Sequence, residues 1–258
     1  MNIWDVIAIQ PMTNVLVVLS NFLFHNFGLA IIALTIIING VIYPLTVKQI
    51  RSSKAMQDMQ PKLLELQKKY AKDKQKLAQE QMRLYKEAGM SPAGCILPMI
   101  IQMPIWIALY QSIIRLLGQT PEDFLGLSHY LYNWPIVYST LPLDNSFLWL
   151  NLVQPDSFFI LPILVGGTMW VQQKMVTPTV GDPNQQAQSR MMLWLMPIIF
   201  AFFTLQFAAG LALYWVTSSI IRIIIQYFIT GWGGLIPKKA PSPATAPVPV
   251  KETRYKKH

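Results

Sequence analysis

Charged residues are scarce in this chain of 258 residues, of which 13% are charged and 53% are hydrophobic. Soluble domains carry roughly 25% charged residues, so the shortage indicates a membrane protein. The single cysteine, Cys95, excludes an internal disulfide framework. The three histidines are scattered and have no ligand-like neighbour at helical spacing, so we expect neither a metal site nor a cofactor.

The residue sets that typify enzymes are also missing. The sequence has no Ser–His–Asp arrangement and no phosphate-binding glycine loop, and its apolar segments hold no paired carboxylates. We therefore expect a protein that is not an enzyme. The apolar segments in fact contain no Asp or Glu at all, which argues against a proton- or sodium-coupled pump.

Long apolar runs dominate what is present. A transmembrane helix needs roughly 20 mainly apolar residues, and five segments reach that length, at least marginally. They cover residues 27–47, 95–117, 158–176, 191–209 and 211–229. Only Ala209 and Gly210 separate the last two, which predicts a tight turn there. The expected fold class is an all-α integral membrane protein with five transmembrane helices.

The N-terminal stretch 3–24 is less clearly a span. It is apolar but interrupted by a set of polar residues and a proline, namely Asp5, Gln10, Pro11, Asn14 and Asn21. This composition favours a helix lying at the membrane interface. A signal peptide is the alternative, although no Lys or Arg precedes the apolar run and no clean cleavage site follows it.

The basic residues predict how the chain is oriented. Segment 48–94 holds eleven Lys or Arg against five acids, the tail from residue 230 holds six against one, and segment 118–157 holds none against four. Basic connections stay in the cytoplasm. We therefore predict a multi-pass protein of the cell (plasma) membrane, with its N-terminus outside and its C-terminus in the cytoplasm.

The cytoplasmic connection is predicted to be a helical hairpin. Met56, Met59, Leu63 and Leu66 recur at three- and four-residue steps, as in a coiled-coil seam. Asp73 is placed to cap a second helix, and Pro61 predicts a kink or a fresh helix start in the first. The expected segments are thus an external N-terminal interfacial segment (1–26), a first transmembrane helix (27–50), the cytoplasmic hairpin (51–92), a second transmembrane helix (93–117), an external loop (118–157), transmembrane helices three to five (158–230) and a disordered basic cytoplasmic tail (231–258).

Polar residues recur inside the apolar segments. Each segment carries at least one, and the set includes Thr35, Asn39, Gln102, Gln173, Trp215, Ser218 and Arg222. An unpaired buried amide costs roughly 2–7 kcal/mol on transfer scales, so these groups either bond one another between helices or face water in a shared cavity. Because all five segments contribute, and prolines interrupt four of them, we favour a hydrated cavity.

The order of the motifs resembles the YidC/Oxa/Alb family of membrane protein insertases. The resemblance runs from about residue 27 to 230 and rests on "FGLAIIALTIII" followed by "GVIYPLTVKQIRSSKAMQDMQPKL", then "AGCILPMIIQMPIWIALY", "FLWLNLVQPDSFFILPIL", "QQKM" and "MPIIFAFFTLQFAAGLALYWVTSS". It implies an insertase/chaperone that moves hydrophobic segments of newly made proteins from the cytoplasm into the bilayer. It also implies five spans around a hydrophilic groove that is open to the cytoplasm and sideways to lipid.

The resemblance also implies roles for particular residues and partners. Gln102, Gln173 and Trp215 are expected to line the groove, and the hairpin is expected to meet the substrate first. Where most bacterial members of the family have an Arg thought to attract acidic substrate segments, this chain has Asn39. The implied partners are nascent membrane proteins and the lipid bilayer, with the Sec translocon and the ribosome as further candidates through the hairpin and the basic tail.

Two other functions stay open at this point. A small polytopic transporter or channel would need ion-coordinating residues or an internal repeat, and the sequence offers neither. A membrane-anchored scaffold would not need polar residues in every span.

Overall fold

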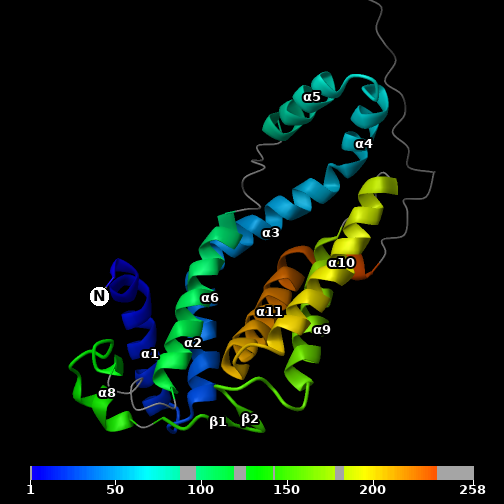
Figure 1. Cartoon of the computed structure of the whole chain (residues 1–258). Coiled ribbons are helices and arrows are strands. Elements are labelled where there is room, and N and C mark those ends of the chain that lie inside the picture. Colours follow the sequence, from blue (N-terminus) through cyan, green and yellow to red (C-terminus); the bar gives the residue numbers. More distant parts are fainter. Residues whose placement is uncertain (1, 88–96, 119–125, 142, 178–182, 237–258) are drawn as a thin grey trace, which may run out of the picture.

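The computed structural model describes residues 2–87, 97–118, 126–141, 143–177 and 183–236. Helices make up most of the described chain, and a two-stranded antiparallel sheet is the only sheet in it (Figure 1). In chain order the elements are the π-helix η1 (Asp5–Ile9), α1 (Gln10–Phe22), α2 (Phe27–Val41), α3 (Tyr43–Asp58), α4 (Gln60–Lys69), α5 (Lys74–Glu87), α6 (Leu97–Leu116), α8 (Pro135–Thr140), β1 (Ser146–Phe147), β2 (Leu150–Asn151), α9 (Ile160–Val176), α10 (Pro183–Thr204), α11 (Ala209–Thr230) and the 3-10 helix η3 (Gly233–Leu235).

The described residues contain three helices long and apolar enough to cross a membrane. These are Asp5–Phe22, Gln186–Thr204 and Ala209–Thr230, and a fourth span results if the bent pair α2 and α3 is counted as one. The apolar part of α6, Ile100–Leu116, and the 17-residue α9 are shorter. The structure therefore agrees with a helical membrane protein of three to four candidate spans, while five spans remain a proposal.

The first predicted span is two helices rather than one. α2 and α3 meet at Ile42 with a bend of 65°. Pro44 lies in the first turn of α3, where it lacks an N–H for the carbonyl one turn earlier and its ring clashes with that carbonyl. By contrast, Pro104 and Pro197 lie inside continuous helices, so only some of the prolines interrupt the helices as predicted. The bend turns the axis of α3 away from that of α2, and α3 leads out to α4 and α5 (Figure 1).

Two shorter helices follow at the far end of α3. α4 is a fresh start, with Pro61 in its first turn, as the sequence predicts. Asp73 caps α5 by accepting a hydrogen bond on its Oδ1 from the backbone N–H of Lys76 at 3.0 Å. α4 and α5 pack on one another and project beyond the other helices (Figure 1).

The turn predicted at Ala209 and Gly210 is wrong by several residues. α10 ends at Thr204 and α11 already begins at Ala209, so the connection is 205–208. The first backbone N–H groups of α11, which have no partner within the helix, donate to the carbonyls of Gln154 and Leu152 at 2.8 and 3.0 Å. Gly210 permits this close approach because a Cβ there would lie 3.2 Å from the Leu152 carbonyl oxygen. The same Cβ would also press on Ile31 of α2 and Ile113 of α6.

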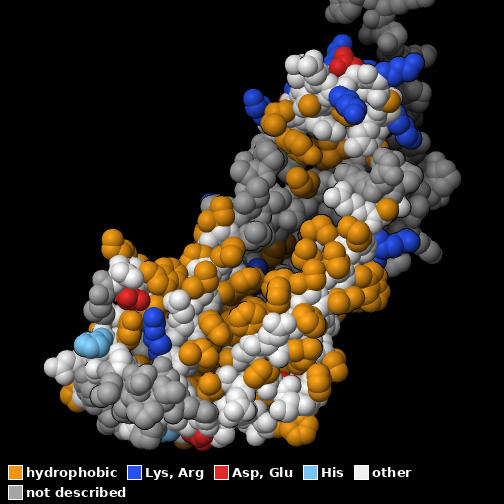
Figure 2. Space-filling model, in the orientation of Figure 1, with side chains coloured by type: hydrophobic (Ala, Val, Ile, Leu, Met, Phe, Trp, Pro, Cys, Tyr) orange, Lys and Arg blue, Asp and Glu red, His pale blue; other side chains and the backbone are white. Residues whose placement is uncertain are grey.

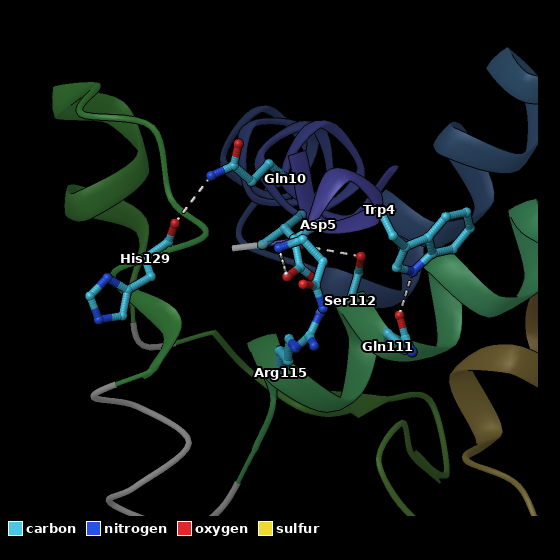
Figure 3. A network of polar contacts seen from close by, with 9 residues as sticks. Trp4, Asp5, Gln10, Gln111, Ser112, Arg115 and His129 are labelled. Carbon is cyan, nitrogen blue, oxygen red and sulfur yellow. Dashed lines mark hydrogen bonds and ion pairs between the residues drawn. The ribbon is translucent and has the colours of Figure 1, made fainter. Parts of the chain in front are cut away.

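The N-terminal helix is held against the other helices by polar contacts. Trp4 Nε1 donates to Gln111 Oε1 at 2.9 Å, and Asp5 lies 3.9 Å from Arg115 (Figure 3). Asn14 is buried, and its side chain bonds backbone groups of the 126–134 segment. The polar residues that favoured an interfacial helix are therefore engaged within the protein, and the helix is long enough to span. The interfacial placement is not confirmed.

An apolar core fills the end of the bundle where the β-strands lie. Phe27 and Ile31 of α2, Leu109 and Ile113 of α6 and Tyr214 of α11 are almost completely buried there. Residues of the 126–152 segment close the same end, among them Leu127, Val137, Leu150 and Leu152. The opposite ends of α9 and α11 are thus the place where polar side chains can meet.

Two glycines of α2 allow a matched test of this packing. A Cβ at Gly28 would collide with the ring of Phe147, whereas a Cβ at Gly40 would meet no atom within 4 Å. Overpacking costs about 1–3 kcal/mol, while Gly→Ala in an open helix gains up to about 1 kcal/mol. We expect Gly28→Ala to lower the midpoint of thermal unfolding in detergent and Gly40→Ala to leave it unchanged or higher. Equal midpoints would contradict the close contact between Gly28 and Phe147.

Candidate functional site

Polar side chains of three helices surround one pocket, which we call the polar pocket. It lies between α3, α9 and α11 and has a volume of about 180 Å³. Its polar lining residues are Thr46, Gln49, Ser53, Lys54 and Gln57 of α3, Gln172 and Gln173 of α9, and Arg222, Gln226 and Thr230 of α11. None of the described residues that line it is a carboxylate.

A second pocket, of about 210 Å³, adjoins the first and is mainly apolar. Trp106, Met169 and Phe200 form its apolar wall, and Gln102, Trp215, Ser218 and Ser219 lie around it. Gln49, Gln172 and Arg222 line both pockets. We call the two pockets together the groove. Figure 2 shows a recess in the surface between the α6 and α10 sides, with orange hydrophobic side chains around it.

Arg222 is bound to the wall of the groove by neutral partners. Its Nη2 donates to Gln102 Oε1, and Gln102 Nε2 donates in turn to the Tyr214 hydroxyl at 2.6 Å. No ion pair of Arg222 is present among the described residues. The guanidinium is thus a half-buried positive charge without a counter-charge, which is unusual in a membrane-spanning segment and typical of a functional site.

Two donors at the groove have no hydrogen-bond partner in the described protein. They are Arg222 Nε and Trp215 Nε1, both buried. Such a donor is costly to leave unpaired, so each needs water or a group of a bound molecule. Around Trp215 the other contacts are aromatic, with ring centroids of Trp106 and Phe200 at 5.7 and 5.4 Å.

Asn39 and Thr35 lie beside the groove rather than in it. Asn39 is 3% exposed and lines neither pocket. Its Nδ2 donates to the Thr35 carbonyl at 2.8 Å and to Ser218 Oγ at 3.3 Å, and the Thr35 hydroxyl donates to the Ile31 carbonyl. The Asn39 side chain therefore joins α2 to α11, and it reaches the groove only through Ser218.

The remaining predicted groove residues lie at the pockets. Gln172 and Gln173 both line the polar pocket, and Gln172 alone reaches the apolar one. Trp215, Ser218 and Arg222 follow one another along α11, so the polar stripe expected on this helix forms a wall of the groove.

The hairpin residues are placed differently from one another. Leu63 is 3% exposed and is packed inside, while Met56, Met59 and Leu66 are half-buried. In this arrangement Leu63 is not available to a substrate. Met82 of α5 is the large apolar side chain that this part of the chain exposes most, at 47%.

The contribution of α3 was missed in the sequence. Thr46, Gln49, Ser53 and Gln57 repeat at three- and four-residue steps and so share one face of the helix. The same periodicity test that found the stripe on α11 would have found this one. Gln57 also donates to the Val176 carbonyl at the end of α9.

The chemistry available here is hydrogen bonding and positive charge. Among the described residues no group of His, Cys, Asp and Glu is placed to hold a metal ion. Amides, hydroxyls and a guanidinium can bond backbone carbonyls, water and anions.

Comparison with known proteins gives a consistent result. The family profile described as "60Kd inner membrane protein" matches residues 18–233. The membrane protein insertase MisCA of Bacillus subtilis is 37% identical over 233 residues, covering 88% of this chain and 79% of the relative. The membrane protein insertase YidC 2 of Bacillus anthracis is 39% identical, covering 89% and 82%.

A longer relative matches over part of its length. The membrane protein insertase YidC of Syntrophus aciditrophicus is 42% identical over 206 residues, which are 80% of this chain and 33% of that protein. Since the profile covers most of the chain and two relatives match over about four-fifths of their own length, the chain belongs to the 60Kd inner membrane protein family, the YidC/Oxa/Alb family that its motifs resemble.

Proposed function

We propose that this protein is a membrane protein insertase that moves hydrophobic segments of newly made proteins from the cytoplasm into the bilayer through the groove. The observation that carries the proposal is a polar pocket, with no acid among its described lining residues, that adjoins an apolar one inside a helical membrane protein. The names of the relatives, which are membrane protein insertases, support the same function.

The physical advantage of such a groove is a shorter path through hydrocarbon. An unsatisfied backbone group costs several kcal/mol in the bilayer core. Amides of Gln102, Gln172 and Gln173, together with water, can bond the polar end of a substrate while it crosses. The apolar segment then enters lipid sideways, past Trp106 and Phe200, and its burial drives the process without a nucleotide.

The short α9 contributes to the same effect. Its 17 residues span about 25 Å at 1.5 Å per residue, whereas the hydrocarbon core is about 30 Å thick. A span that is too short thins the bilayer around it. Local thinning beside the groove reduces the distance that a polar group must travel.

The topology belongs to this proposal. It places five spans in the cell membrane, formed by α2 with the first part of α3, α6, α9, α10 and α11, with the N-terminus outside and the C-terminus in the cytoplasm. The positively charged connection containing α4 and α5 then lies in the cytoplasm. It is the part that first meets a nascent chain, and its Lys and Arg suit the ribosome or the Sec translocon as further partners.

Asn39 cannot supply a positive charge to the groove, so another residue must do so. Asn39 is neutral, buried and bonded to Ser218. Arg222 lines both pockets and has no acidic partner among the described residues. We assign to Arg222 the attraction of acidic substrate segments and to Asn39 the positioning of Ser218.

Reconstitution tests the activity directly. Proteoliposomes containing the full chain should insert a newly synthesised single-span protein, and a photo-crosslinker at Gln172 should join it to that substrate. A crosslinker at Ile163, which is 71% exposed on the opposite side of α9, serves as control. If insertion matches that of empty liposomes while solute flux rises, the protein is a transporter or channel instead.

Water in the groove can be tested by cysteine labelling. In a Cys95→Ser background, Gln172→Cys in membranes should react with a water-soluble maleimide because it lines the polar pocket. Ile198→Cys should be protected because lipid covers it, although 60% of Ile198 is exposed in the protein alone. If Gln172→Cys is protected from the maleimide as strongly as Ile198→Cys, water does not reach the groove.

The charge of Arg222 should matter only for acidic substrates. A pair of unit charges about 4 Å apart in water interacts by about 1 kcal/mol. We therefore expect Arg222→Gln to slow insertion of a substrate with an acidic translocated end roughly fivefold, and Arg222→Lys to retain most of the rate. Insertion of a neutral-ended substrate and the effect of Arg190→Gln, at an exposed position of α10, are the controls. An equal loss with both substrates would make Arg222 a purely structural residue.

A further inference from the structure

The polar pocket carries two positive charges and nothing in the described protein neutralises them. Lys54 of α3 and Arg222 of α11 both line it. Neither forms an ion pair with a described residue, and no carboxylate lines the pocket. Half-buried cations that share one pocket repel each other and favour an anion between them.

The pocket lies toward the C-terminal ends of α9 and α11, which we place near the lipid headgroups. Val176 and Thr230, at the ends of α9 and α11, mark its rim. Near the same end of α11, the rings of Tyr227 and Trp232 have centroids 4.9 Å apart, and both residues are more than 40% exposed. Exposed Tyr and Trp at a helix end are typical of the membrane–water interface.

The adjoining apolar pocket begins where the charged one ends. Arg222 lines both, and Trp106, Met169 and Phe200 form an apolar wall on the far side. A ligand that fills the whole groove therefore needs an anionic head and a hydrocarbon tail. A phospholipid has both, and basic pockets between transmembrane helices on the cytoplasmic side are known to hold anionic lipid headgroups.

We propose that the polar pocket binds the phosphate headgroup of an anionic phospholipid, with Lys54 and Arg222 as its cationic ligands and an acyl chain along Trp106, Met169 and Phe200. Serine and glutamine side chains of the pocket, among them Ser53 and Gln57, supply neutral hydrogen bonds to the headgroup. A zwitterionic lipid binds less well because none of the described lining residues is an acid that could pair with its amine. Lipid binding at this site does not depend on the insertase activity.

Native mass spectrometry of the full chain in mild detergent tests the site. Phosphatidylglycerol should bind in preference to phosphatidylcholine. Lys54→Gln should weaken phosphatidylglycerol binding roughly fivefold, the effect expected for one Lys near an anionic lipid. Lys68→Gln removes the same charge at an exposed position of α4 outside the pocket and should leave binding unchanged.

Three results would overturn the proposal. They are equal binding of the two lipids, equal effects of Lys54→Gln and Lys68→Gln, and displacement of phosphatidylglycerol by millimolar inorganic phosphate or glycerol phosphate. The last result would identify the occupant as a free anion held without its tail. Because the readout is lipid mass bound to the protein, failure here and failure of the insertion assay are separate results.

Discussion

Hydrocarbon offers no partner to a polar group, and this constraint organises the helices around α11. Tyr214, Ser218, Arg222 and Gln226 follow one another at four-residue steps along this helix. Tyr214 and Arg222 are bonded to Gln102 of α6, and Ser218 is bonded to Asn39 of α2. The same helix packs on α9 and α3. α11 is therefore the element through which the polar groups of the other helices are satisfied.

The two ends of the bundle differ in the polarity of their side chains. At the end with β1 and β2, apolar side chains and the carbonyls of Leu152 and Gln154 leave no polar group of the first turn of α11 free. At the other end, amides of α3, α9 and α11 face one another across open space. The proposed insertion needs this asymmetry, because a bundle that is apolar at one end and polar at the other can admit a polar chain part-way without forming a pore.

Much of this arrangement could be predicted from the sequence because periodicity and charge are local. The stripe on α11, the fresh helix start at Pro61 and the cap at Asp73 all follow from spacing and side-chain chemistry. What could not be predicted depends on tertiary contacts. The partners of Asp5 and Asn14 lie about 110 residues further along the chain, and the burial of Asn39 depends on Ser218, 179 residues away. The interruption at Pro44 is predicted from the sequence, whereas the 65° angle of the bend at Ile42 is not.

The bend at Ile42 has a mechanical consequence. α3 supplies one wall of the polar pocket and also carries α4 and α5 at its far end. One continuous helix therefore joins the pocket to α4 and α5, while α2 is bonded to α11 through Asn39. A change in the bend angle would therefore move α4 and α5 together with the pocket wall at Thr46, although Thr46 and Lys86 of α5 are 40 residues apart in sequence.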